Sequence, residues 1–173
     1  MNLWPFDRKK SAAAVPNEKL PIPTYLRPYF VPVQEKCSMA EVAGDIRCTC
    51  GGMTFKARRS EDYGCLFGLK CTSCGQDLLL FDSKQHGWDV LVCGMVPEDD
   101  ATIDCTEKCA KCGGEDFHAT VWIEACQKEE FTEDVPAGLT EDDWVNAFGW
   151  FGAHLTCASC GHKVRDWADV ETA

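Results

Sequence analysis

Two short cysteine arms, Cys109–Cys112 and Cys157–Cys160, restrict the fold of this chain more than any other part of its sequence, and each is followed directly by glycine. In each arm two thiols lie three positions apart, and the glycine permits the tight turn that presents both sulfurs to one point. Four sulfurs complete the tetrahedral shell of a structural zinc ion. The spacing therefore predicts that the two arms together bind one metal ion.

The same arrangement occurs upstream, in Cys48–Gly51 and Cys71–Gly75, which predicts a second site of the same kind. The first of these arms has one residue fewer between its sulfurs, so Cys37 and Cys65 remain alternative ligands. We expect two zinc ions, and iron is the alternative because such arms also resemble rubredoxin. With sulfur in all four positions, neither metal is expected to be catalytic. The predicted metal ligands are Cys48, Cys50, Cys71, Cys74, Cys109, Cys112, Cys157 and Cys160.

The two cysteine sets lie in similar sequences. Residues 50–57 match residues 112–119 in their Cys, Gly, Gly, Phe and Ala positions, and residues 69–75 match residues 155–161 around Leu, Cys and Gly. This correspondence predicts duplication of one module. We expect a first lobe over residues 44–98 and a second over residues 105–170.

The segments between the cysteine arms have the composition of short strands. Apolar and polar residues alternate over residues 53–58, and apolar runs occupy residues 63–70, 77–82 and 88–93. The predicted fold is therefore mainly β, with two modules of short antiparallel strands and a small helix in the second.

The N-terminal arm, residues 1–36, contains six of the eight prolines. This density excludes a long helix or a central strand and predicts an extended arm. Residues 20–33 are rich in large apolar side chains, so we expect them to pack against the folded body. The alternative is a peptide that docks on a partner.

The second lobe carries an acidic insertion, residues 127–146. Residues 128–143 contain seven carboxylates and one lysine. A short helix is expected from Thr140, its N-cap, to Phe148, and an exposed acidic loop is expected before it, over residues 129–138. We expect the insertion to contact a partner, together with the aromatic residues Trp144, Trp150 and Phe151, which are expected to be exposed.

Charge limits the class of partner. The net charge is −11; residues 1–36 contribute +3, so the remainder carries −14. Such a chain repels phosphate backbones and favours a basic protein partner. A nucleic-acid-binding function is the alternative, and Lys56, Arg58 and Arg59 would then bind the phosphates. No apolar run approaches the length of a membrane span, and thirteen cysteines with no secretory signal indicate a reducing cytoplasm.

No nucleophile or acid–base arrangement stands out, so no catalytic residue is predicted. The segment from His86 to Asp89, with Asp82 nearby, is the one cluster that resembles a site, and a turn before a strand is the favoured interpretation. The cysteines outside the two predicted sites are Cys37, Cys65, Cys93, Cys105 and Cys126. Cys65 and Cys93 are expected in the core, and Cys105 is an alternative ligand.

These cysteine arms and the strands between them resemble the zinc-ribbon (rubredoxin-like) family over about residues 44–170. The whole chain also looks like small bacterial proteins of unassigned role that have two sets of four cysteines. The resemblance implies zinc ribbons, which serve in transcription, translation, nucleic-acid processing and protein docking. The expectation is therefore a non-catalytic zinc protein that binds or regulates another protein, such as a toxin. A nucleic-acid-binding ribbon and a rubredoxin-like electron carrier are the alternatives.

Overall fold

In the computed structural model, the described residues are 19–87, 100–126, 128–133, 135 and 140–172. The elements, in chain order, are β1 (Phe30–Pro32), η2 (Gln34–Lys36), β2 (Glu41–Ile46), β3 (Phe55–Arg59), β4 (Leu66–Cys71), β5 (Asp77–Asp82), β6 (Cys105–Thr106), β7 (Asp116–Ala125), α1 (Lys128–Glu133), η3 (Glu141–Asn146), β8 (Phe148–Cys157) and β9 (Lys163–Glu171). The fold is mainly β, as predicted.

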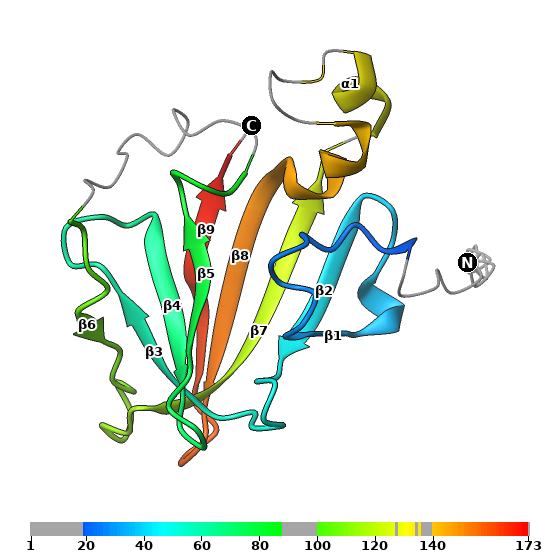
Figure 1. Cartoon of the computed structure of the whole chain (residues 1–173). Coiled ribbons are helices and arrows are strands. Elements are labelled where there is room, and N and C mark those ends of the chain that lie inside the picture. Colours follow the sequence, from blue (N-terminus) through cyan, green and yellow to red (C-terminus); the bar gives the residue numbers. More distant parts are fainter. Residues whose placement is uncertain (1–18, 88–99, 127, 134, 136–139, 173) are drawn as a thin grey trace, which may run out of the picture.

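Strands from both predicted lobes join in one antiparallel sheet. Its path runs β1-β2-β7-β3-β4-β5, while β8 pairs with β7, β9 with β8, and β6 with β3. Two three-stranded units, β3-β4-β5 and β7-β8-β9, meet where Phe55 pairs with Phe117. The sheet is curled (Figure 1). The β4–β5 and β8–β9 turns lie at its lower end, opposite α1, which belongs to the β7–β8 connection.

One core serves both units and the N-terminal arm. Phe55 and Phe117 are fully buried, and Leu20, Ile22 and Leu26 of the arm belong to the same apolar cluster. The prediction that residues 20–33 pack on the body is confirmed by the burial of Leu20, Ile22, Leu26 and Phe30, whereas residues 34–36 are exposed. Prolines limit regular structure there, and the described part of the arm contributes the short β1, which pairs with β2, and the single 3-10 turn η2.

Several sequence-based boundaries change. The strand predicted over residues 63–70 begins at Leu66, while Asp77–Asp82 is found as predicted. The strand predicted over residues 88–93 lies outside the described residues. The structure also adds β2, which pairs with the long strand β7.

The described part of the acidic insertion contains a helix where a loop was predicted, and residues 134 and 136–138 of that predicted loop lie outside the described residues. The helix α1 occupies Lys128–Glu133, within the segment predicted to be a loop, and its Phe131 is fully buried. Burial of one large apolar side chain anchors a segment that acidic composition alone assigns to solvent. Thr140 precedes η3, a 3-10 helix, and its backbone N–H donates to Asp143 Oδ2 at 2.9 Å. Phe148 belongs to β8 rather than to this helix.

Candidate metal centres

The four cysteines of the first predicted site come together at the ends of β3 and β4. The Sγ atoms of Cys48, Cys50, Cys71 and Cys74 all lie within 4.8 Å of one another. Cys48 Sγ is 3.6 Å from Cys74 Sγ, and Cys50 Sγ is 3.7 Å from Cys71 Sγ. The alternative ligands are elsewhere: the Cys37 thiol donates to the Val33 and Ala43 carbonyls, and Cys65 lies outside the cluster.

The second site has the same arrangement. Cys109, Cys112, Cys157 and Cys160 place their sulfurs within 4.8 Å of one another. The Cys109–Cys160 and Cys112–Cys157 sulfur pairs are each 3.6 Å apart. Cys105 is exposed in β6 and is not part of this cluster.

These distances fit a tetrahedral metal ion. Sulfurs bonded to zinc at about 2.3 Å lie about 3.8 Å apart in a tetrahedron, whereas sulfurs of a disulfide are about 2.05 Å apart. Each cluster could therefore hold one metal ion. A complete shell of four sulfurs leaves no position for a reacting water, so such an ion would stabilise structure.

Glycine conformation explains why the arms converge. Each arm is followed by a glycine with positive φ: 90° at Gly51, 77° at Gly75, 73° at Gly113 and 69° at Gly161. Residues that carry a side chain rarely adopt this backbone conformation. In each case the glycine N–H donates to the carbonyl of the first cysteine of its arm, at 2.7–2.9 Å. The sequence pattern thus encodes the turn that brings two sulfurs to one point.

Without a metal ion, the thiols of each cluster do not ionise together, because one thiolate disfavours the ionisation of its neighbours. Although burial favours the neutral thiol, backbone N–H groups of residues 73–74 lower the pKa of Cys71 to about 7, and the equivalent groups of residues 159–160 lower that of Cys157 to about 6. Elsewhere in the clusters the backbone N–H groups of Gln76 and Gly114 favour ionisation, but hydrogen bonding to neighbouring sulfurs raises the pKa of Cys74 and of Cys112 to about 12. A divalent cation would attract all the thiolates and remove this opposition.

The two units repeat the same pairing around their clusters. Phe55 pairs with Cys71 as Phe117 pairs with Cys157, and the strand positions that follow match as well. Within each second arm, the N–H of the residue after the first cysteine donates to a carbonyl at or just before the start of the facing strand: Thr72 to Thr54, and Ala158 to Asp116. The first unit keeps these pairings although its Cys48–Cys50 arm is one residue shorter.

The units are also related across their junction. The Lys56 ammonium lies 2.9 Å from Glu115, and the His118 ring lies 2.9 Å from the Met53 carbonyl, which is the same pair of positions with the units exchanged. The leading strands are exchanged too, because β2 pairs with β7 and β6 pairs with β3. Each cysteine unit therefore completes its sheet with a strand that leads into the other.

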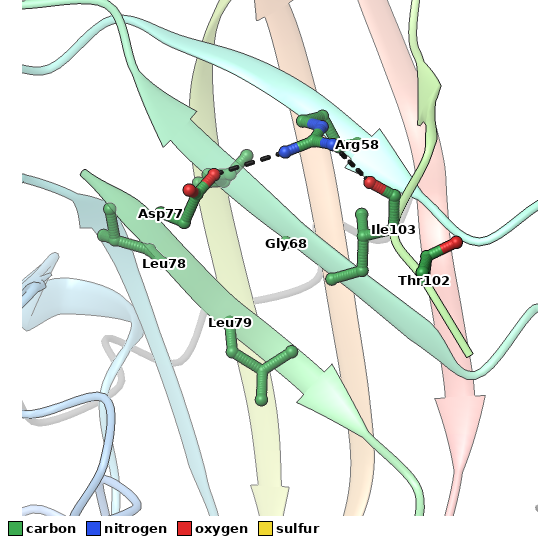
Figure 2. A pocket seen from close by; sticks show the side chains of 8 residues that line it. Arg58, Gly68, Asp77, Leu78, Leu79, Thr102 and Ile103 are labelled. Atoms are coloured by element: carbon green, nitrogen blue, oxygen red, sulfur yellow. Dashed lines mark hydrogen bonds and ion pairs between the residues drawn. The ribbon is translucent and has the colours of Figure 1, made fainter. Parts of the chain in front are cut away.

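The basic residues considered for nucleic-acid binding already contact carboxylates. Lys56 pairs with Glu115, Arg58 with Asp77 at 3.3 Å, and Arg59 with Glu107 at 3.2 Å; these are contacts along one strand, β3. Figure 2 shows Arg58 between Asp77 and the Ile103 carbonyl, to which it also donates a hydrogen bond, at the rim of a hollow of about 360 Å³. These pairs reduce the positive potential available to a phosphate.

The cluster at His86 is a turn, as favoured from the sequence, within residues 82–87. Asp82 is buried and accepts hydrogen bonds from the Lys84 backbone and the Gln85 side chain. Its own backbone N–H donates to His86 Nδ1 at 3.1 Å, and the His86 ring stacks on Tyr25 of the arm. Burial lowers the pKa of His86 to about 4, although Asp82 acts in the opposite sense. Trp88 and Asp89 lie outside the described residues.

One part of the expected contact surface is wrong. Phe151 is fully buried, because the alternation of β8 points it into the core while Trp150 points outward. Trp144 and Trp150 are half-buried. The expectation of exposed aromatics therefore holds in part for these two and fails for Phe151.

Comparisons with known protein families, curated proteins and solved structures find no match to this chain. In the described part of the chain, no helix has the length and apolar character needed to cross a bilayer.

Proposed function

We propose that the chain is a non-catalytic zinc protein whose two metal ions hold a scaffold for binding a basic protein partner. The observation that carries the structural half of this proposal is the presence of two clusters, each with four sulfurs 3.6–3.7 Å apart in its closest pairs. Such shells stabilise folds and leave no open coordination position for chemistry.

Zinc is the proposed ion in both sites, with iron as the alternative. Four thiolates in a tetrahedron suit either metal. Elemental analysis of freshly purified protein should give about two zinc ions per chain and no visible absorbance. A coloured protein with stoichiometric iron would instead support an electron-carrying function.

Residues 44–98 and 105–170 would then be two zinc-ribbon modules derived by duplication. The matching pairs Phe55–Cys71 and Phe117–Cys157 support this, as does the exchange-related contact of Lys56 with Glu115 and His118 with Met53. Antiparallel pairing of Phe55 with its counterpart Phe117 gives the pseudo-two-fold arrangement typical of a symmetric dimer. Thiolates reserved for metal also favour a reducing cytoplasm as the location.

A basic protein is the proposed partner because the chain carries a net charge of −11, and opposite potentials accelerate encounter. A toxin neutralised by this acidic surface is one example. Nucleic acid is disfavoured because the cations of β3 are paired with carboxylates. Binding to DNA or RNA that weakens steeply with salt would reverse this preference.

The test uses the metal-loaded full chain as bait in an extract of its source. Replacing Glu129, Glu130, Glu133 and Asp134 by Gln or Asn should remove the specific partner if the insertion contacts it. The matched control replaces Glu61 and Asp62, which are exposed acidic residues outside the insertion. Recovery of the same partner by the wild-type chain, the insertion variant and the control variant would exclude the insertion as the contact surface.

A further inference from the structure

The outer face of β2, β7, β8 and β9 carries an unusual set of side chains. Along β7 burial alternates strictly from Phe117 to Ile123, so Val121 and Ile123 face the core while Thr120, Trp122 and Glu124 face outward. Pairing across the strands places Trp122 opposite Ala43 and Gly152, and Glu124 opposite Glu41 and Trp150. Aromatic and acidic residues thus share one solvent-facing surface.

Two tryptophans form the centre of this surface. The Trp122 and Trp150 rings are stacked, with centroids 6.4 Å apart and planes 17° from parallel. Trp122 lies against Gly152, where any Cβ would collide with the indole, and the Trp150 Nε1–H donates to Asp169. The small residue and the hydrogen bond hold both half-buried rings in fixed orientations, which preorganises an aromatic platform.

Carboxylates surround the platform. Glu41 and Glu124 are exposed and directly opposite one another, and neither forms an ion pair within the described residues. Like charges at directly opposed positions destabilise a sheet. The other carboxylates of this face are Asp45, Asp166, Asp169 and Glu171. Lys36 and His154 lie on the same face, and His154 is close to Asp166, so the carboxylates outnumber the cations. The surface therefore favours a further cation near Glu41 and Glu124.

Two other tryptophans of the chain already hold cations. The Arg59 guanidinium lies 5.1 Å from the Trp167 ring centroid, and the Lys128 ammonium lies 5.9 Å from that of Trp144. Neither Trp122 nor Trp150 has such a partner among the described residues. Among the four tryptophans that the structure describes, this pair is thus the one best placed to receive a cation from outside.

We infer that this face, centred on Trp122 and Trp150, binds an arginine-bearing segment of a protein partner. The inference deepens the proposed function and rests on it, but it assigns the main contact to the sheet rather than to the acidic insertion. A planar guanidinium stacks on indole faces and pairs with carboxylates at the same time, which an ammonium does less well. A hollow of about 340 Å³ beside Trp122 offers room for the adjoining backbone, and its other lining residues are Lys36, Glu41, Ala43, Thr120 and His154.

The test measures binding of a labelled peptide of alternating arginine and glycine to the metal-loaded full chain by fluorescence anisotropy. Citrulline and lysine versions of the peptide are the controls for charge and for guanidinium shape. Spectra of the indole N–H groups identify which tryptophans respond. The sheet-face variants are Trp122→Leu and the double variant Glu41→Gln/Glu124→Gln, which relieves repulsion and therefore retains the fold. The matched variant in the insertion is Trp144→Leu/Glu129→Gln.

We expect the arginine peptide to bind more tightly than the lysine peptide, and the citrulline peptide to bind least. Trp122→Leu should weaken binding about 5- to 30-fold, the double Gln variant should also weaken it, and the insertion variant should stay within about twofold of wild type. Equal binding by all variants, loss only in the insertion variant, or no preference for arginine would each overturn the inference. Loss only in the insertion variant would leave the proposed function intact, because a basic segment would still be bound, and metal content is determined separately.

Discussion

The two cysteine units share a framework, but their outward side chains differ in charge. On β3-β4-β5 the outward residues include Lys56, Arg58 and Lys70, and the first two pair with Glu115 and Asp77. On the equivalent face of β7-β8, with β2 beside it, Glu41 and Glu124 confront each other around stacked tryptophans. Within the described residues, Lys56 and Arg58 on one face are paired with carboxylates of the chain itself, whereas Glu41 and Glu124 on the other face form no ion pair.

This difference separates structural from functional residues. Cysteines, the glycines that follow them and the phenylalanines at the junction are equivalent in both units, which is expected of residues that fold the chain. The outward strand positions differ, which is expected of residues that contact something else. Substitutions in four parts of the molecule test this contrast.

The largest effect is expected from removing one metal site. Replacing Cys71 and Cys74 by Ser, or Cys157 and Cys160 by Ser, should remove one metal ion and destabilise the whole sheet, because both units share one core and exchange leading strands. Thermal unfolding should show one transition at a much lower temperature in either variant. A melting curve in which one unit unfolds early while the other keeps its wild-type transition would show that the two units unfold independently, which contradicts a shared core.

The junction should tolerate little change. Phe117→Ala removes a fully buried ring where the units meet and should cost about 3–5 kcal/mol of unfolding free energy. Phe55→Ala is the matched variant in the other unit and should cost about the same. Urea unfolding measures both, and a cost below about 1 kcal/mol at either position would mean that the units do not depend on this contact.

The His86 turn belongs to the first unit only and should make stability pH-dependent. In the folded chain the pKa of the His86 imidazole is about 4, below the ordinary value of 6.5. As pH falls, the imidazole is therefore protonated in the unfolded chain first. Stability supplied by neutral His86 is complete above pH 6.5 and is lost as pH falls toward 4. Allowing for solvent screening of the half-buried ring, the loss is about 2 kcal/mol.

The check compares wild type with His86→Phe, which keeps the stack on Tyr25 but cannot be protonated. The difference in unfolding free energy between the two proteins should change between pH 6.5 and 4. A constant difference across this window would contradict the assignment of a neutral, half-buried imidazole.

The smallest effects should have opposite signs on the two faces. Glu124→Gln removes a like-charge contact and should stabilise by less than about 1 kcal/mol, an effect that shrinks with added salt. Arg58→Gln removes the pair with Asp77 and the hydrogen bond to the Ile103 carbonyl, and should destabilise by about 1 kcal/mol. Melting temperatures at low and high salt measure both, and the same sign for both variants would contradict the contrast between the faces.

Sequence reasoning predicted the local features well. Cysteine spacing and the following glycines are local, so both clusters could be predicted, and Asp77–Asp82 was identified by composition. The exchange of β2 and β6 between the units could not be predicted, because it depends on contacts far apart in the chain. Phe151 was misjudged since it follows Trp150 within an apolar run, where composition conceals which residue faces inward. The strict alternation around Trp122 was the available signal for the outer face.

Native mass spectrometry of the intact chain during titration with a chelator, followed by circular dichroism, tests whether metal holds the sheet together. Two bound metal ions per chain are predicted, and their removal should abolish the cooperative unfolding of the sheet. A chain that carries fewer than two ions as purified, or that unfolds unchanged after complete chelation, would contradict a metal-held scaffold.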